Sequence, residues 1–312
     1  MRIIPHIKIV GVGGAGGNAL SRMAKLKIAG VEFIAINTDV QDLKKTSADI
    51  KLRIGREITQ GLGAGMNPEI GRKAAEEQKE EIAAILKGGD LVFVAAGFGG
   101  GTGSGATPVI AEIAKSLGIL TVAVITKPFA FEGASRKAIA SGGIKNIEDK
   151  VDSLLLISND KLLPLVEKNT PLVKAFILAD EVLRQAVFCI TDLVLRPSLV
   201  NISFADIKTI LKNSGRSFFG QGMGRGQNRG QEAVNKALSS PLLEISPEQA
   251  SKVLFSISAR HLKLAEIDVV ASNITKNILP ETKVIFGARE DERLKPEEMK
   301  VILIATGFSP RR

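Results

Sequence analysis

The sequence predicts an α/β protein with a parallel, Rossmann-like sheet domain, a long central helix and a smaller mixed α/β C-terminal domain. In the first half of the chain, apolar strands alternate with amphipathic helices, which is typical of a parallel sheet covered on both faces. Apolar residues then recur at steps of three and four from position 172 to 194, which indicates one long helix. After Pro197 strands and helices interleave less regularly, so a second, mixed domain is expected.

The elements of the first half follow from these patterns. The segment DLVFVAAGF at 90–98 is apolar after its first residue, as expected of a strand buried on both faces. The predicted strands cover residues 6–12, 31–38, 90–98, 120–126 and 154–158. The predicted helices cover residues 16–28, 69–86 and 106–117. Ligands of such sheets bind at the carboxyl ends of the strands, where the glycine-rich turns of this chain fall.

The long helix is predicted from Pro171 to Leu195. Thr170 suits the N-cap, Pro171 suits the first helical position, and Pro197 ends the helix. At about 1.5 Å per residue the helix spans about 37 Å. The second domain is predicted to hold helices over 228–239 and 265–277, strands over 252–258, 283–288 and 300–306, and a loop over 220–230.

Composition narrows the classes of function. With 312 residues, 45% of them hydrophobic, the chain is long enough for two domains with their own cores. It shows no apolar run of bilayer length and no signal-peptide pattern, so we expect no transmembrane segment and a cytoplasmic location. Two histidines and the single Cys189 argue against a zinc site. The net charge is +9, but the basic residues are scattered and there is no Trp or Tyr to stack bases, so no nucleic-acid partner is expected.

The most informative segment is the run GGGTGSG at 99–105, between an apolar strand and a helix. Glycine lets backbone amides approach a ligand that a side chain would block, and a helix N-terminus adds unpaired amides and partial positive charge. The segment therefore predicts an anion cradle, most plausibly for phosphates. The alternative is a flexible loop, which rarely sits at a strand-to-helix junction.

A second glycine-rich turn follows the first strand. It contains G-x-G-x-x-G as Gly11, Gly13 and Gly16, and Asp39 follows the next strand, where a dinucleotide fold places its ribose-binding acid. This segment alone fits an NAD-dependent oxidoreductase. Against that alternative, a nicotinamide enzyme does not need a second polyglycine cradle, and the chain offers little for hydride chemistry. Two cradles at adjacent strand ends instead suggest one polyphosphate held from both sides, with the glycines of 61–65 closing over its far end.

At this point the chain resembles the FtsZ family, the tubulin-like bacterial cell-division GTPases. The matching segments run in family order over residues 7–215: VGVGGAGGNA at 10–19, INTD at 36–39, GLGAGMNPE at 61–69, GGGTGSG at 99–105, TKPFAFEG at 126–133 and SND at 158–160. The Phe176 and Asp180 pair continues the match. Ser104 stands where most of the family has threonine.

The resemblance implies roles for particular residues. Gly14, Ala15, Gly16 and Gly17, with Gly101, Thr102 and Gly103, would cradle the phosphates of GTP or GDP, and Gly65 would lie by the terminal phosphate. Glu132 and Arg136 would contact the ribose, and Asn18, Asn159 and Asp180 would read the base. A carboxylate accepts two hydrogen bonds from guanine, which adenine cannot offer. Phe176 would stack on the base or, equally well from the residues alone, belong to the helix core. Mg²⁺ would be held mainly by phosphates and water, with no metal site on protein side chains.

The catalytic group would come from the segment NISFAD at 201–206, through Asn201 and Asp206. Because a helix of roughly 30 Å separates this segment from Asp180, the resemblance implies that Asp206 acts on the nucleotide of a neighbouring subunit in a head-to-tail filament. The family pattern N-x-D-x-x-D is broken, because Ser203 replaces the first aspartate. We expect slower GTP turnover than in typical relatives; the alternative is that Ser203 only caps the following helix, 204–211.

The resemblance thus implies a GTPase that polymerises and forms the cell-division ring scaffold at mid-cell, with itself and division-machinery proteins as partners. The expected domains are a GTP-binding domain over 1–170, a connecting helix over 171–196 and a polymerisation and activation domain over 197–312. A nucleotide-dependent filament with weak hydrolysis remains an alternative. Two departures are the positive net charge, where relatives are commonly acidic, and the end at Arg312, without the linker and C-terminal peptide that relatives carry.

Overall fold

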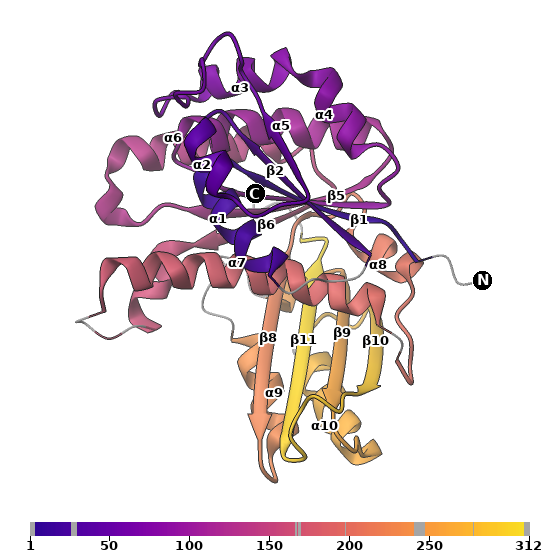
Figure 1. Ribbon diagram of the computed structural model, residues 1–312. Helices are drawn as coiled ribbons and strands as arrows, with labels where there is room; N and C mark the ends of the chain where they lie inside the picture. Colours follow the sequence, from indigo (N-terminus) through magenta and orange to yellow (C-terminus); the bar gives the residue numbers. More distant parts are fainter. Residues whose placement is uncertain are drawn as a thin grey trace. The chain divides into compact units, whose positions relative to one another are not determined.

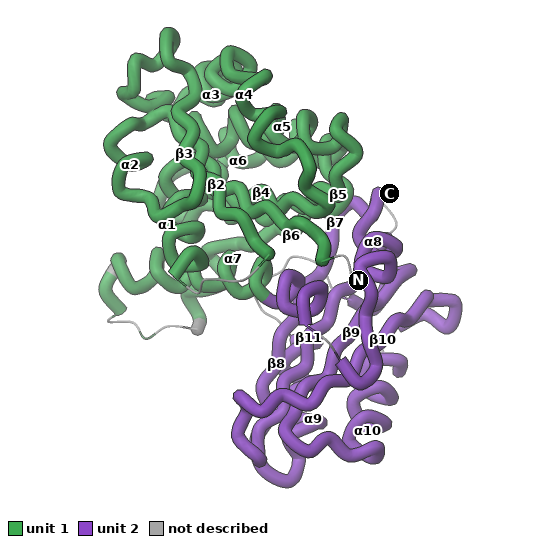
Figure 2. Tube along the Cα trace, turned by 45° about the vertical axis from the view of Figure 1, so that its right-hand side comes forward, with its two compact units in different colours: residues 1–188 green, residues 189–312 purple. Residues whose placement is uncertain are grey.

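A computed structural model describes residues 4–25, 30–165, 167, 170–196, 198–239, 247–276 and 278–308. The chain forms two compact units, residues 1–188 and 189–312 (Figure 2). Pro197, predicted to end the long helix, lies outside the described residues, as do the predicted helix ends at 28 and 277. In the described parts of the chain, each helix is too short or too polar to span a bilayer.

The first unit is built on a parallel sheet whose strands run in the order β3-β2-β1-β4-β5-β6. The order reverses between β1 and β4, and parallel α/β sheets bind their ligands at the carboxyl ends of two such strands. The strands are β1 (Ile7–Val12), β2 (Val31–Asn37), β3 (Ile50–Arg53), β4 (Leu91–Gly97), β5 (Leu120–Lys127) and β6 (Ser153–Ser158).

Helices cover both faces of this sheet. On one face, side chains of α3, α4, α5 and α6 pack into a buried apolar cluster with β1, β2 and β4; α1 lies on the opposite face (Figure 1). The helices are α1 (Gly13–Ala24), α2 (Val40–Lys45), α3 (Pro68–Glu77), α4 (Lys79–Leu86), α5 (Gly101–Ser116) and α6 (Ala134–Ile147), with short 3-10 turns at Ala130–Glu132 and Asn159–Leu165.

Some predicted boundaries are wrong in an informative way. The helices expected at 16 and 106 begin at Gly13 and Gly101, so both glycine-rich segments are first turns of helices rather than separate loops. The helix expected over 69–86 is broken at Gln78, whose backbone leaves helical geometry and whose side-chain oxygen accepts a hydrogen bond from the Gly55 amide. Strand β3 and helices α2 and α6 were not predicted, since short or glycine-containing segments show weak periodicity.

The long helix α7 (Leu172–Leu195) runs through the boundary between the units. The second unit then holds a four-stranded mixed sheet in the order β10-β9-β11-β8, in which β9 and β10 are parallel and the other pairs antiparallel. Its elements are α8 (Phe204–Leu211), β7 (Gly215–Arg216), β8 (Phe218–Arg225), α9 (Arg229–Leu238), a 3-10 turn (Pro247–Gln249), β9 (Lys252–Ala259), α10 (Leu264–Thr275), β10 (Lys283–Glu290) and β11 (Glu298–Thr306).

The predicted loop over 220–230 is wrong, because most of it is strand β8. Its glycines fall at every second position, so they share one face of the strand. A Cβ added at any of them would lie 1.8–1.9 Å from a backbone oxygen of α9, so this helix packs directly on the strand backbone. The three pairs are Gly220 with Ala237, Gly222 with Ala233, and Gly224 with Arg229. Glycine here serves close packing rather than flexibility.

Candidate functional site

The site is built around the N-termini of α1 and α5, which follow β1 and β4 at the point where the strand order reverses. Neither N-terminus has a side-chain cap, whereas Asp39, Asn67 and Ser203 cap α2, α3 and α8. The first amides of an α-helix have no partner within the helix and carry partial positive charge. Two such ends at one edge of the sheet can bind a polyphosphate.

The two helix ends lie in contact. A Cβ added at Gly13, where φ is +70°, would lie 3.3 Å from the Gly103 amide nitrogen. Of the predicted cradle residues on α1, Gly14 and Ala15 are exposed, while Gly16 and Gly17 are buried. A Cβ at Gly16 would lie 2.3 Å from the Ala95 carbonyl oxygen, so this glycine brings α1 against β4.

The glycines of α5 divide in the same way. A Cβ at Gly103 would lie 2.3 Å from the Gly97 carbonyl oxygen, and one at Gly101 would lie 2.8 Å from Ala64 Cβ, in the third glycine loop. That loop is therefore packed against the α5 N-terminus. Gly65, with φ of +54°, has open space on its Cβ side, as expected of a residue that faces a ligand.

The half-buried Thr102 is held in place by a residue that sequence reasoning missed. Its hydroxyl lies 2.6 Å from the Thr38 hydroxyl, at the end of β2, and Thr38 is fully buried. The neighbouring Asp39 caps α2 by accepting from the amides of Gln41 and Asp42. Both bonds go to Asp39 Oδ1, so the cap occupies one oxygen of the carboxylate on which the NAD alternative relied.

A buried carboxylate lies further along the site. The side chain of Asp180, on α7, is 15% exposed, and its Oδ2 lies 3.5 Å from Arg22 Nε. Burial raises the pKa of Asp180 to about 6, although Arg22 opposes the shift. Asn18 is exposed on α1, and Arg22 follows it by one helical turn, on the same face of the helix. This spacing is the sequence signal that could have placed Arg22 near the predicted base contacts.

Phe176 lies one turn before Asp180 and is 39% exposed. It packs edge-on against Phe129, with ring centroids 5.6 Å apart. The Phe129 amide donates to Glu132, which is also paired with Arg136 at 2.8 Å. Contacts therefore link the predicted base residues of α7 to the predicted ribose residues Glu132 and Arg136.

Asn159, at the end of β6, supplies an observation that favours a ligand. The residue is 6% exposed, and its Oδ1 atom has no hydrogen-bond partner. A buried polar atom without a partner costs free energy, so such atoms are usually satisfied by water or a ligand. The amide oxygen of Asn159 fits a donor on a bound base.

The predicted catalytic residues belong to the second unit. Asn201 is exposed and Asp206 is half-buried in the first turn of α8. Ser203 is the N-cap of α8: its amide and hydroxyl donate to Asp206 Oδ2 at 2.9 and 2.6 Å, and its hydroxyl accepts from the Asp206 amide at 3.2 Å. Ser203 therefore does cap this helix, and in doing so it engages one oxygen of the predicted catalytic carboxylate.

The residues present in the first unit fit a guanine nucleotide. Unpaired helix amides stand at one end, and a buried carboxylate with an unsatisfied amide oxygen stands among the predicted base contacts. Within the described residues, no three His, Cys, Asp or Glu side chains are grouped to hold a metal ion.

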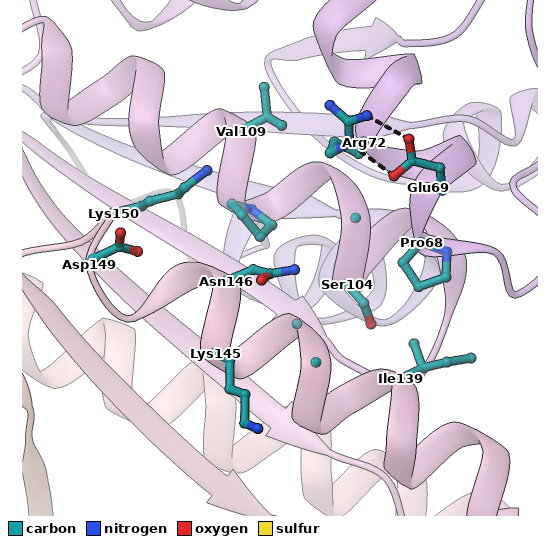
Figure 3. A pocket seen from close by; sticks show the side chains of 14 residues that line it. Pro68, Glu69, Arg72, Ser104, Val109, Ile139, Lys145, Asn146, Asp149 and Lys150 are labelled. Atoms are coloured by element: carbon teal, nitrogen blue, oxygen red, sulfur yellow. Dashed lines mark hydrogen bonds and ion pairs between the residues drawn. The ribbon is translucent and has the colours of Figure 1, made fainter.

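A separate groove of about 510 Å³ lies between α3, α5 and α6 (Figure 3). Its wall includes Glu69 paired with Arg72, and Lys145 and Asn146 of α6. It contains none of the predicted nucleotide residues. Its link to the site is Ser104, whose hydroxyl accepts from the Gly99 amide at 2.9 Å and so helps to shape the turn before α5.

Comparisons with known proteins agree with this geometry. Residues 6–167 match the family model described as the GTPase domain of the Tubulin/FtsZ family, and residues 215–309 match the C-terminal domain of the FtsZ family. Among solved structures, an empty FtsZ dimer from M. jannaschii is 42% identical, with a TM-score of 0.90 over 97% of this chain and 88% of that chain.

More distant structures share the fold. A GTPγS-bound protofilament of CetZ2 from Haloferax volcanii is 19% identical, with a TM-score of 0.81 over 98% of this chain and 94% of that chain. CetZ from Methanosaeta thermophila is 20% identical, with the same TM-score over 99% and 88%.

Proposed function

Because the chain belongs to the tubulin/FtsZ family of GTPases, we propose that it polymerises head to tail, completes its GTP site between subunits and forms a cell-division scaffold. The observation that carries the proposal is the meeting of two uncapped helix N-termini at the switch point of a parallel sheet. The buried Asp180 and the unsatisfied Asn159 oxygen support a guanine at the other end.

The binding roles follow from the surroundings of each residue. The exposed amides of Gly14 and Ala15, with those of Gly101, Thr102 and Gly103, bind the phosphates, and Gly65 borders the terminal one. Gly16 brings α1 against β4, close enough for this contact, and Gly17 packs against the Thr46 side chain. Glu132 and Arg136 bind the ribose, Phe176 offers a ring face to the base, and Asn18, Asn159 and Asp180 read its edge.

Hydrolysis requires a group that positions water, and the glycine turns supply no carboxylate for that purpose. We assign this role to Asp206, helped by Asn201, acting on the nucleotide of the next subunit. Asp180 lies within helix α7 (Leu172–Leu195), and the part of the helix after it, about 22 Å long, separates this base-reading residue from the catalytic segment along the chain. A head-to-tail contact uses two different surfaces and therefore builds open filaments. The 42% identical FtsZ structure was solved as a dimer.

Mixing two inactive variants tests this mechanism. Asp206→Ala keeps the nucleotide site but lacks the activating acid, and Asp180→Ala keeps the acid but loses guanine binding. Each alone should release phosphate at a small fraction of the wild-type rate. Their equimolar mixture should regain activity if Asp206 works in trans. Full turnover by Asp206→Ala alone, or a mixture as inactive as its components, would contradict the mechanism.

In the cell, we propose that the protein forms a ring in the cytoplasm at mid-cell and binds division-machinery proteins. We also propose that Mg²⁺ binds together with GTP. Residues 1–170 would bind GTP, 171–196 would connect, and 197–312 would serve polymerisation and activation. Depletion of the protein should give long, undivided cells, and a fluorescent fusion should form a band at mid-cell. Altered cell shape with normal division would instead assign the filament to another cytoskeletal role.

A nucleotide-dependent filament with weak hydrolysis is the second candidate, and Ser203 is the observation that favours it. Serine brings no negative charge to the catalytic segment and engages Asp206. Phosphate release per sedimented subunit separates the two: a rate near zero in stable, GTP-containing filaments would favour the second candidate.

A further inference from the structure

The segment that carries Asn201 and Asp206 is fastened to the edge strand β10 at three consecutive residues, Gly287, Ala288 and Arg289. We call these three residues the β10 clasp. Each one contacts a different point between the end of α7 and the start of α8. The clasp lies within the second unit, as does the whole catalytic segment.

The central contact is a two-residue ladder. The Val200 amide donates to the Ala288 carbonyl and the Ala288 amide donates to the Val200 carbonyl, both at 3.1 Å. This isolated antiparallel bridge adds Val200 to the free side of β10, the edge strand of its sheet. Paired hydrogen bonds of this kind fix both the position and the direction of a short segment.

The second contact is steric. Ile202 is 4% exposed, although both its neighbours, Asn201 and Ser203, are exposed. A Cβ added at Gly287 would lie 2.6 Å from Ile202 Cδ1 and 2.8 Å from its Cγ1. The absence of a side chain at Gly287 therefore makes the space that buries Ile202. With Ile202 anchored inward, the two polar neighbours remain at the surface.

The third contact is a buried ion network. Arg289 Nη2 donates to Asp192 Oδ2 on α7 at 2.8 Å and to Asp291 Oδ2 at 3.2 Å, and all three residues are less than 10% exposed. Buried charges are costly unless they are paired, so this geometry is tightly specified. The network ties the last turns of α7 to the strand that holds Val200 and Ile202.

We propose that the β10 clasp positions the catalytic segment for the neighbouring subunit, so that Gly287 and Arg289 set the rate of GTP turnover without contacting the nucleotide. The inference rests on the proposed function, because it takes Asp206 as the activating acid. Proximity catalysis is sensitive to displacements of about 1 Å, so a small shift of Ile202 is enough to reduce turnover.

The test uses the Gly287→Ala variant of the full chain, with Glu290→Gln, an exposed change on the same strand, as the matched control. Gly287→Ala should bind GTP within about twofold of wild type and sediment with GTP, but turn over about tenfold more slowly per sedimented subunit. Glu290→Gln should match wild type in all three measurements. Thermal unfolding checks that each chain is folded.

A rescue distinguishes positioning from damage to the fold. In Gly287→Ala with Ile202→Val, the methyl group added to the strand is matched by the loss of Cδ1, the Ile202 atom closest to it, and an apolar anchor remains in the loop. Turnover should recover at least in part. Arg289→Lys keeps the charge but replaces the planar guanidinium, whose Nη2 donates to both Asp192 and Asp291. It provides an independent variant and should also lower turnover more than GTP affinity.

Normal turnover per sedimented subunit in both Gly287→Ala and Arg289→Lys would overturn the clasp. So would equal losses of GTP affinity and turnover, because the nucleotide residues lie in the other unit. The failure of the proposed function looks different: Asp206→Ala would then retain turnover, whatever the clasp variants do.

Discussion

At the scale of single residues, Asp180 is the proposed base-reading carboxylate, and its charge state bears on that role. Burial raises the pKa of Asp180 to about 6, and Arg22 is the nearby cation that opposes the shift. Above pH 6 both carboxylate oxygens can accept from the two guanine donors, and below it one oxygen carries a proton and becomes a donor, so the pair of acceptors is lost. If Asp180 reads the base as proposed, its charge state, rather than its presence alone, limits guanine binding.

Affinity for GTP should accordingly fall as the pH is lowered from 7.5 through about 6, with little change above 7. The loss in the Asp180→Asn variant should be roughly 3 kcal/mol, about a hundredfold in affinity. Its remaining affinity should not depend on pH in this range. Equilibrium binding of a fluorescent GTP analogue measures both effects, and the same pH profile in Asp180→Asn would assign the titration to another group.

Ser203 is the second residue with a defined consequence. Its hydroxyl donates to Asp206 Oδ2 at 2.6 Å, so the helix cap occupies one of the two oxygens of that carboxylate. Ser203→Asp removes that donor, still caps α8 and adds negative charge near the water to be activated. We expect turnover several-fold faster than wild type by steady-state phosphate release. Ser203→Ala is the control; no gain in Ser203→Asp would contradict the idea.

At the scale of elements, glycines determine how closely helices approach the sheets. In α1 and α5 they bring helix N-termini against β4, and in β8 they let α9 rest on the strand backbone. A glycine has no such role in packing where the helix faces open space, as at Gly142 of α6. Position in the packing, rather than composition, decides what a glycine contributes.

Gly222→Ala should therefore destabilise the second unit, since the new methyl would collide with the Ala233 carbonyl, at 1.8 Å. Overpacking of this kind costs about 1–3 kcal/mol. Gly142→Ala is the matched control and should stabilise α6 by about 0.5–1 kcal/mol, because alanine favours a helix. Urea unfolding followed by circular dichroism compares the two. Equal stabilities would show that α9 shifts away at no cost.

At the scale of the whole molecule, the proposed site is divided between the nucleotide residues of one unit and the catalytic segment of the other. If the site is completed between subunits, hydrolysis becomes a property of the filament and not of the monomer. The +9 net charge opposes assembly, because subunits of like charge repel one another as they approach.

Phosphate release plotted against protein concentration should thus stay near zero up to a threshold and rise linearly above it. Sedimentation should show the same threshold with GTP, and no pellet with GDP at that concentration. Asp206→Ala should pellet with GTP but release little phosphate. A rate strictly proportional to concentration, with no threshold, would show that a single subunit hydrolyses GTP unaided.

Local sequence determined the elements with strong periodicity. The buried strands around 90–98 and 120–126, the long helix from 172 and the glycine turns after β1 and β4 all follow from residue types along the chain. The order of the motifs also identified the family, which the family models confirm. These features could be predicted from the sequence because each depends on neighbours a few residues away.

Only the tertiary structure decided the contacts between distant residues. Three of these contacts join positions separated by 64 to about 160 residues: Thr38 with Thr102, Arg22 with Asp180, and β10 with Val200 and Ile202. The packing of the β8 glycines depends on which face of the strand meets a helix. No local pattern encodes such pairings, because the free energy that selects them comes from packing and from satisfying buried polar groups once the chain has folded.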